Sequence, residues 1–271
     1  MKNGILIYDE EGAKRNQWFI NTLLESAKDY NLNLRLVIFK NMPTFLFEDN
    51  IDFAINRVIS PKLTYKLEKR GIKVFNNYMT SLIANDKWKT FKLCKKLNIP
   101  VMNTKKISKI NKKTIKNFPV IAKCVDGHGG SQVFLVNNLE ELKSLSTLCL
   151  SNKKYFILQE PCSDKGIDVR MYVLNGKIIS SVLRRSLTDF RSNFSLGGDI
   201  ELFTPTKAQV EIVDKLCNKL KCDFVGVDFI YHDNDWVLNE IEDVVGTRML
   251  YKLTDILPHQ LLLNHISNIL E

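Results

Sequence analysis

The stretch that decides the fold is FVGVDFIYHDNDWVLNEIE, residues 224–242. Two runs rich in β-branched and aromatic residues flank the polar segment HDND, and this pattern predicts an antiparallel hairpin. The second run carries Glu240 and Glu242, although carboxylates are unfavourable in strands and neighbouring like charges repel. Something in the folded protein must therefore offset the repulsion within this hairpin.

The register of the hairpin decides which side chains meet. Side chains alternate along a strand, so Glu240 and Glu242 share one face, and Asn239 and Asp243 lie on the other. A three-residue loop would set Asp228 opposite Glu240, whereas a two-residue loop would set Asp228 opposite Asn239. In the first register three carboxylates form one patch that would suit Mg²⁺. A solvated outer face is the alternative, but Phe229 and its apolar neighbours favour a buried strand and a metal site.

The segments upstream of this hairpin predict an antiparallel α+β arrangement. A second hairpin turns at Asn175-Gly176, the strongest two-residue turn signal. Further elements are expected over 119–125, 131–137, 139–149, 155–160, 206–220 and 254–270.

The first 77 residues follow a different pattern, because short apolar runs alternate there with helical periodicity. A helix is expected over 15–30, with Trp18, Phe19, Leu23 and Ala27 facing inward. Ser60 and Pro61 are a capping residue and a first-turn proline, so another helix should begin there. This alternation predicts a small parallel α/β lobe.

The composition is that of an ordinary globular protein, with 45% hydrophobic and 25% charged residues. Apolar runs are far shorter than the roughly 20 residues of a membrane span, and the N-terminus does not read as a signal peptide, so we expect a cytoplasmic protein without a membrane partner.

Six scattered cysteines are expected to be reduced thiols, not zinc ligands. The net charge of +9 could suit nucleic acid, but the Lys-rich run 105–117 lacks aromatic residues for stacking, which argues against that partner.

Two lysines occupy positions where a positive charge is unfavourable unless it is solvated or close to an anion. Asp86 caps a helix whose first residue is Lys87, and a cation there opposes the helix dipole by about 0.3–1 kcal/mol. Lys123 lies within the strand VIAKCV, where charges are rare. Solvation could explain Lys87, whereas a nearby anion would explain both lysines.

The segment DGHGG directly follows the strand of Lys123. Gly127, Gly129 and Gly130 permit positive φ angles and let backbone N–H groups approach a phosphate. The spacing is that of neither a Walker loop nor a dinucleotide fingerprint. His128 could bind a phosphate or remain solvated, and the segment could also be a flexible turn.

Arginines are concentrated in DVR and LRRSLTDFRSN, although the chain otherwise favours Lys. Planar guanidinium groups bind phosphates and carboxylates in bidentate fashion, which favours a function. Structural ion pairs with aspartates are the alternative. The residues concerned are Arg170, Arg184, Arg185 and Arg191, and the aspartates are Asp168, Asp189 and Asp199.

The order of these motifs resembles the ATP-grasp superfamily, specifically the RimK-like carboxylate–amine ligases that include α-L-glutamate ligases. The resemblance runs from about residue 76 to 250 and is strongest over 157–246. It implies an ATP-grasp fold with a pre-ATP-grasp α/β domain over 1–77. A small lobe with the Gly-rich loop would span 78–157, and a C-terminal lobe with the metal site would span 158–271, so that the two α+β lobes clasp ATP.

The resemblance also implies roles for residues around ATP. The phosphates would be contacted by Lys87, Lys123 and the loop glycines Gly127, Gly129 and Gly130. The hinge against adenine would be formed by Gln159, Glu160, Pro161 and Cys162. Asp168 would hold the ribose, and Arg191 would reach ATP.

The reaction centre follows in the same way from the resemblance. The phosphorylated carboxylate would be steadied by Arg170, Arg184, Arg185 and Asn193. Mg²⁺, with Mn²⁺ as an alternative, would be held by Asp228 and Glu240, with Glu242 where the family usually has Asn. The turn DVVG after Glu242 also departs from the family's small turn, which leaves the acceptor substrate open.

The implied enzyme is an ADP-forming carbon–nitrogen ligase. It would join a small-molecule or peptide carboxylate to an amine through an acyl phosphate, and the family resemblance allows a homo-oligomer. Two alternatives share the same ATP site: a phosphotransferase that makes a phosphate ester, and a non-catalytic nucleotide-binding module. The lack of an obvious Ser/His or Cys/His pair suits phosphoryl transfer, which depends on positioning and charge neutralisation.

Overall fold

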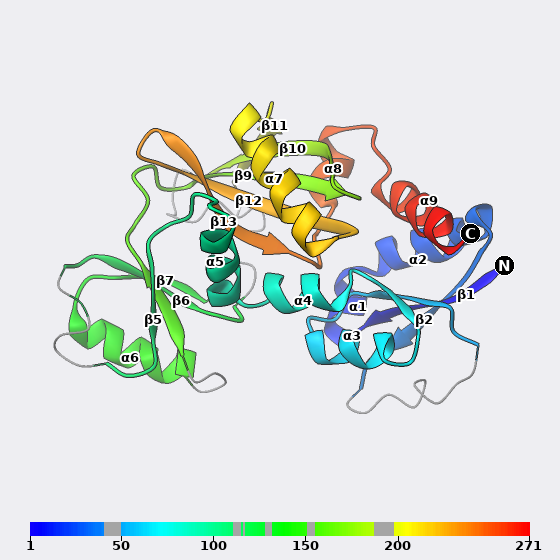
Figure 1. Cartoon of the computed structure of the whole chain (residues 1–271), viewed down its shortest axis with the longest axis horizontal. Helices are drawn as coiled ribbons and strands as arrows, with labels where there is room; N and C mark the ends of the chain where they lie inside the picture. The colour runs from blue at the N-terminus through cyan, green and yellow to red at the C-terminus, as the bar shows by residue number, and fades with distance from the viewer. Residues whose placement is uncertain (41–49, 111–114, 116, 128–131, 151–154, 187–197) are drawn as a thin grey trace.

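The computed structural model describes all residues except 41–49, 111–114, 116, 128–131, 151–154 and 187–197. The described residues form three sheets, one parallel and two antiparallel. The parallel sheet lies at one end of the molecule and the smaller antiparallel sheet at the other, with the five-stranded sheet above and between them (Figure 1). This arrangement confirms the mixed α/β and α+β prediction.

The N-terminal lobe contains the parallel sheet, in the order β2-β1-β3-β4. Its α3 helix starts as expected, because the Ser60 side chain accepts a hydrogen bond from the Leu63 N–H. The described elements are β1 Lys2–Tyr8, α1 Glu10–Arg15, α2 Gln17–Ser26, the 3-10 helix η1 Ala27–Tyr30, β2 Leu32–Ile38, β3 Phe53–Asn56, α3 Pro61–Glu68 and β4 Lys73–Phe75.

The single helix predicted over 15–30 is wrong in two respects. The chain forms α1 and α2 with a break at Asn16, whose side-chain amide donates to the Gly12 carbonyl. Phe19, Leu23 and Ala27 are buried as predicted. Trp18 is instead 62% exposed and contacts the edge of the Tyr251 ring, because the helix places it on the side that faces away from the sheet core.

The middle lobe is a four-stranded antiparallel sheet in the order β5-β8-β6-β7. The helices α4 and α5 connect it to the N-terminal lobe, and α6 packs against it (Figure 1). Asp86 caps α5 as predicted, since its carboxylate accepts from the Lys89 N–H at 3.0 Å. The elements are α4 Tyr78–Ala84, α5 Lys87–Lys96, β5 Thr104–Ile107, β6 Val120–Cys124, β7 Val133–Val136, α6 Leu139–Leu150 and β8 Phe156–Gln159.

The C-terminal lobe is a five-stranded antiparallel sheet in the order β11-β10-β9-β12-β13. Its first hairpin turns at Asn175 and Gly176 as predicted, and both residues have positive φ. The elements are β9 Ile167–Leu174, β10 Lys177–Arg185, β11 Asp199–Leu202, α7 Lys207–Leu220, β12 Phe224–His232, β13 Asp235–Glu242, α8 Arg248–Leu253 and α9 Pro258–Leu270.

The second hairpin, β12 and β13, has a two-residue loop of Asp233 and Asn234, and both residues have positive φ. Sequence reasoning associated such a loop with Asp228 opposite Asn239, and this expectation is wrong. The register shifts between Phe229 and Asp228, and Asp228 pairs with Glu240. A β-bulge therefore restores the carboxylate patch that the three-residue loop was expected to produce.

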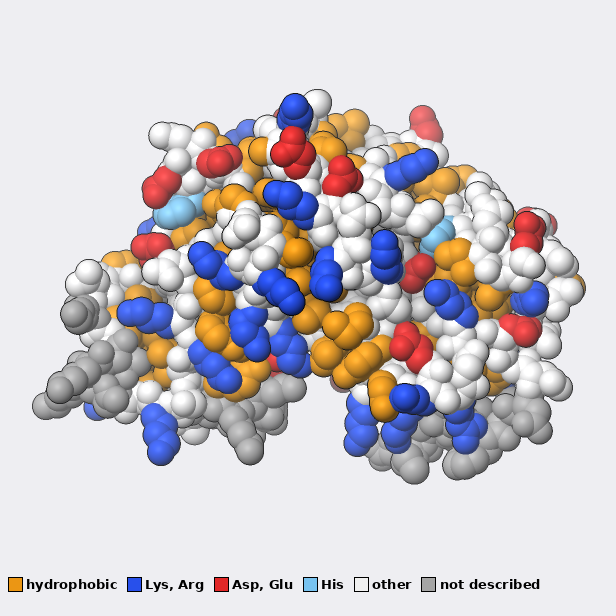
Figure 2. Space-filling view, viewed as in Figure 1, with side chains coloured by type: hydrophobic (Ala, Val, Ile, Leu, Met, Phe, Trp, Pro, Cys, Tyr) orange, Lys and Arg blue, Asp and Glu red, His pale blue; other side chains and the backbone are white. Residues whose placement is uncertain are grey.

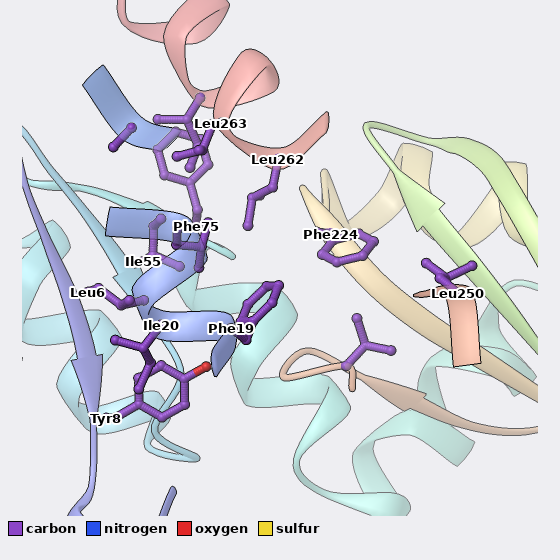
Figure 3. Close-up of a cluster of buried hydrophobic side chains, with 14 of the residues drawn as sticks. Leu6, Tyr8, Phe19, Ile20, Ile55, Phe75, Phe224, Leu250, Leu262 and Leu263 are labelled. Atoms are coloured by element: carbon purple, nitrogen blue, oxygen red, sulfur yellow. The ribbon is translucent and has the colours of Figure 1, made fainter. Parts of the chain in front are cut away.

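One hydrophobic cluster joins the first and last lobes of the molecule. Figure 3 shows Phe19, Ile55 and Phe75 of the N-terminal lobe beside Leu262 and Leu263 of α9, with Phe224 of β12 and Leu250 of α8 nearby. The C-terminal helix α9 packs against α2, so the end of the chain returns to the N-terminal lobe. This shared core fixes the parallel lobe relative to the sheet that carries the carboxylates.

The cysteines agree with the sequence expectation only in part. Cys94, Cys162, Cys217 and Cys222 are free, whereas Cys124 is disulfide-bonded, so the expectation of reduced thiols is wrong for Cys124. Among the described residues, no helix is long and apolar enough to cross a membrane.

Candidate active site

A pocket opens between the middle sheet and the five-stranded sheet. Its empty volume, including the space at the open mouth, is about 890 Å³. Residues from α5, β6, β7, β8, β9, β12 and β13 line it. The side chains that reach it are therefore far apart in sequence and are brought together by the packing of two sheets.

Most of the residues predicted to contact ATP line this one pocket. It receives both lysines, the first loop glycine, the whole hinge, the ribose candidate and one metal-ligand candidate: Lys87, Lys123, Gly127, Gln159, Glu160, Pro161, Cys162, Asp168 and Glu240. Gly129, Gly130, Arg191, Asn193 and His128 lie outside the described residues. The predicted roles of all these residues remain predictions.

The two lysines meet Asn239 and Glu240 at the floor of the pocket. The Lys123 ammonium donates to Asn239 Oδ1 at 2.9 Å, and the Lys87 ammonium lies 3.5 Å from Glu240 Oε2. Lys87 also donates to the Gly127 carbonyl. Burial lowers the pKa of Lys123 to about 8, with Lys87 acting in the same direction and Glu240 opposing it.

The position of Asn239 corrects the alternation argument. Sequence reasoning put Asn239 on the face opposite Glu240, but both residues line the pocket. The register shift in β13 falls between Leu238 and Glu240. Asn239 is therefore the extra residue of a β-bulge, where side chains no longer alternate strictly between the two faces of the sheet. Sequence reasoning missed Asn239 as a site residue because a bulge leaves no clear signal in one sequence.

Asp228, Glu240 and Glu242 form the carboxylate patch that was predicted. Each offers an oxygen within 4.8 Å of the other two. Three carboxylate oxygens are suitable ligands for a hard divalent cation such as Mg²⁺. The donor set therefore fits the metal that the family resemblance implies.

The patch is also neutralised by arginines, which sequence reasoning assigned to the reaction centre. Arg170 donates to both oxygens of Asp228, at 2.8 and 2.6 Å, and to Glu242 at 2.6 Å. Arg184 donates to Asp228 at 2.9 Å and to both oxygens of Asp168. A cation is therefore not the only offset for the repulsion, and both arginines position carboxylates.

This network separates the protonation behaviour of the carboxylates. Burial raises the pKa of Asp228, but Arg170 and Arg184 outweigh burial and lower it to about 2. Burial raises the pKa of Glu242 to about 7; Arg170 opposes this increase, and Asp228 and Glu240 add to it. Asp228 therefore stays ionised at neutral pH, whereas Glu242 gains or loses its proton near neutral pH.

Arg185 does not join this cluster, and its predicted place at the reaction centre stays a prediction. Its side chain is 49% exposed and pairs with Glu201 of β11 at 3.3 Å. Adjacent residues of a strand point to opposite faces, so Arg184 and Arg185 cannot both face the carboxylates.

Apolar side chains that sequence reasoning did not select make up much of the pocket wall. They resemble ordinary core residues in the sequence, and only their placement at the pocket distinguishes them. An apolar wall beside the hinge suits a flat aromatic base. These residues are Met102, Ile121, Val133, Leu135, Ile167 and Ile230.

The unusual turn after Glu242 is anchored to the N-terminal lobe. The Arg57 guanidinium donates to the Val245 carbonyl at 2.8 Å, and the Asn76 amide donates to the Asp243 carbonyl at 2.9 Å. A Cβ added to Gly226 would lie 2.8 Å from a Val245 methyl group. The turn therefore holds β13 against the first lobe, with Asp243 and Val245 buried.

Comparisons with known proteins show which family this chain is similar to. The family model of the RimK-like ATP-grasp domain matches residues 84–266. The protein MG011 of Mycoplasma genitalium is 32% identical over 260 residues, which cover 93% of this chain and 88% of that protein. Human N-acetylaspartylglutamate synthase A is 29% identical over 220 residues, which cover 78% of this chain and 54% of that protein.

Among solved structures, the D-alanine–D-alanine ligase from Bacillus anthracis in complex with ATP has the same fold. It superposes with a TM-score of 0.76 at 17% identity and covers 100% of this chain and 97% of that chain. The protein thus has an ATP-grasp fold. Within that class, the chain belongs to the RimK-like ATP-grasp family.

Proposed function

We propose that the protein is an ATP-dependent carboxylate–amine ligase that forms an amide bond and releases ADP and phosphate. The observation that carries this proposal is the pocket itself, where two lysines, a hinge and a carboxylate patch converge. Human N-acetylaspartylglutamate synthase A, a relative over 78% of this chain, is named for the synthesis of such an amide.

In the first step, a substrate carboxylate oxygen attacks the γ-phosphorus of ATP. The bond from this phosphorus to the β–γ bridging oxygen breaks, so that ADP leaves and an acyl phosphate forms. Protonated Lys87 and Lys123 would neutralise phosphate charge, since both ammonium groups reach the pocket floor. Mg²⁺ at Asp228, Glu240 and Glu242 would supply further charge neutralisation when bound.

In the second step, the amine nitrogen attacks the acyl carbon, phosphate leaves and the nitrogen loses a proton. Arg170 and Arg184 would fix Asp228 and Asp168 while this happens, because they already hold these carboxylates by short hydrogen bonds. The adenine would lie against the apolar wall beside Gln159, whose amide is held by the Thr104 hydroxyl at 2.9 Å.

The test is an ADP-release screen of the full chain with ATP and Mg²⁺ against amino acids and short peptides, with mass detection of products. We expect ADP release that needs both a carboxylate and an amine, and a product mass equal to the two substrates minus water. A phosphate ester formed without an amine would replace the proposal with the phosphotransferase. Stabilisation by ATP and Mg²⁺ without any turnover would replace it with the nucleotide-binding module.

A further inference from the structure

The positive charge of this protein is segregated along the chain. Residues 87–125 contain 12 lysines and no Asp or Glu, whereas the rest of the chain has 27 Lys and Arg against 30 Asp and Glu. This one stretch therefore carries the whole excess of positive charge. A general preference for Lys in the composition would not remove the acidic residues from one segment alone.

The fold collects much of this charge on one surface, formed by α5 and β5. Lys87 and Lys123 turn into the pocket, but the other described lysines of the two elements and the loop after β5 stay at the surface. Figure 2 shows Lys and Arg side chains gathered over the region of α5. The exposed lysines of α5 are Lys92, Lys95 and Lys96, which lie within about one helical turn of one another. On β5 and the loop after it, the exposed lysines are Lys105, Lys106 and Lys109, and the six together are called the basic face.

Aromatic rings lie within the same surface. Trp88 and Phe91 of α5 are half-buried and stack on each other, with centroids 5.2 Å apart and planes at 25°. The Lys106 ammonium lies 3.7 Å from the centroid of the Tyr155 ring. The run 105–117 contains no aromatic residue, but the fold supplies aromatic rings from other elements. The folded surface therefore combines lysines with the aromatic rings that the run 105–117 lacks.

Two simpler explanations account for only part of the basic face. β5 is an edge strand, and lysines on edge strands prevent pairing with other chains, which explains Lys105 and Lys106. Steering of ATP toward the pocket would need positive charge at the pocket itself, where Lys87, Lys123 and Lys165 are already among the lining residues. Neither explanation requires Lys92, Lys95 and Lys96 together with an aromatic pair on the same helix.

We propose that the basic face of α5 and β5 binds single-stranded nucleic acid. The exposed lysines would contact successive phosphates, and Trp88 would offer a ring on which a base can stack, which is the usual combination in proteins that bind single strands. Ammonium groups act as point charges for phosphates and give no base specificity. The predicted binding is independent of sequence, sensitive to salt and independent of the proposed ligase activity.

The experiment measures fluorescence anisotropy of a labelled oligo(U) of about 16 nucleotides, a length that covers the usual site sizes, with the full chain over a range of salt concentrations. The test variant is Lys92→Gln/Lys95→Gln/Lys96→Gln. The matched control is Lys207→Gln/Lys215→Gln/Lys219→Gln, which removes three exposed lysines from α7. We expect the α5 variant to lose about tenfold or more in affinity and its salt slope to fall by about 2, because each phosphate contact on a single strand contributes roughly 0.7.

Two further arms separate this surface from other sources of binding. Poly-L-glutamate of similar length tests whether any polyanion suffices, and excess ADP tests whether the oligonucleotide occupies the pocket. We expect weaker binding of poly-L-glutamate, no competition by ADP, and reduced affinity in Trp88→Leu with an unchanged salt slope. The proposal is overturned if the protein does not bind oligo(U) at low salt, or if both triple variants lose the same affinity for it. It is also overturned if poly-L-glutamate binds equally well, or if ADP displaces the oligonucleotide. Circular dichroism and the melting temperature confirm that each variant is folded.

Discussion

Arg170 bridges Asp228 and Glu242, with one terminal nitrogen 2.6 Å from an oxygen of each. The two carboxylates respond in opposite ways, because the pKa of Asp228 is lowered to about 2 while that of Glu242 is raised to about 7. Asp228 also pairs with Arg184 at 2.9 Å, whereas Arg170 does not outweigh the burial of Glu242 and the nearby charges of Asp228 and Glu240. The raised pKa of Glu242 gives the first prediction.

The stability of the metal-free protein should fall between about pH 4.5 and pH 7 because of Glu242. Its pKa rises from the ordinary value of 4.5 to about 7 on folding. The folded state therefore binds more protons in that window, and the free energy of unfolding decreases as pH rises. This pKa difference corresponds to roughly 3 kcal/mol. Glu242→Gln removes the group, so the melting temperatures of the two proteins should diverge by about 6–12 °C across the window. Parallel pH profiles would show that Glu242 titrates normally.

Glu240 and Glu242 should contribute unequally to activity. Glu240→Gln removes the charge of a proposed metal ligand beside Lys87, and we expect at least about a 100-fold loss of kcat, in line with the loss of a metal-site interaction. Glu242→Asn restores the residue usual in the family and should retain activity within about tenfold. Steady-state ADP release under saturating Mg²⁺ measures both variants. A folded but inactive Glu242→Asn enzyme would mean that Glu242 has a role beyond that of an oxygen ligand.

Lys123 should make ATP use dependent on pH. Its pKa is lowered to about 8, so the ammonium that would bind phosphate is lost as pH rises through 8. We expect kcat/KM for ATP, which reports the free enzyme, to decline above that pH in the wild type. Lys123→Arg should abolish this decline because guanidinium does not titrate. Lys123→Met should raise the KM for ATP sharply below pH 8, where the wild-type side chain is charged, and unchanged ATP kinetics there would refute the assignment.

Arg184 and Arg185 are adjacent in sequence and should behave differently. Arg184→Ala leaves Asp168 and Asp228 without one of their buried partners. Breaking such a pair typically costs about 3–5 kcal/mol of stability. Arg185→Ala removes only an exposed pair with Glu201, which is typically worth about 0–1 kcal/mol. Denaturant unfolding and ADP release of the two variants check this contrast, and similar losses would place Arg185 in the network after all.

The residues of the site were largely predictable where chemistry alone selects them. A lysine within a strand, a glycine-rich segment and an acidic strand are each unfavourable without a ligand or partner, so they are visible as exceptions in the sequence. Lys123, Gly127 and Glu240 accordingly lie in the same pocket. The α/β and α+β organisation was also predictable, because period-2 and period-3.6 apolar patterns reflect local backbone geometry.

Only the tertiary structure decided which of these unusual polar side chains contact one another. The bulge at Asn239 set the register that places Asp228 opposite Glu240 despite a two-residue loop. The packing of β9 and β10 beside β12 directed Arg170 and Arg184 onto the carboxylates and left Arg185 outside. The sequence by itself determined which side chains need a partner, since burial and charge are properties of residue types and local patterns. The choice of partner depends on strand order, register and face, which are set by contacts between segments far apart in the chain.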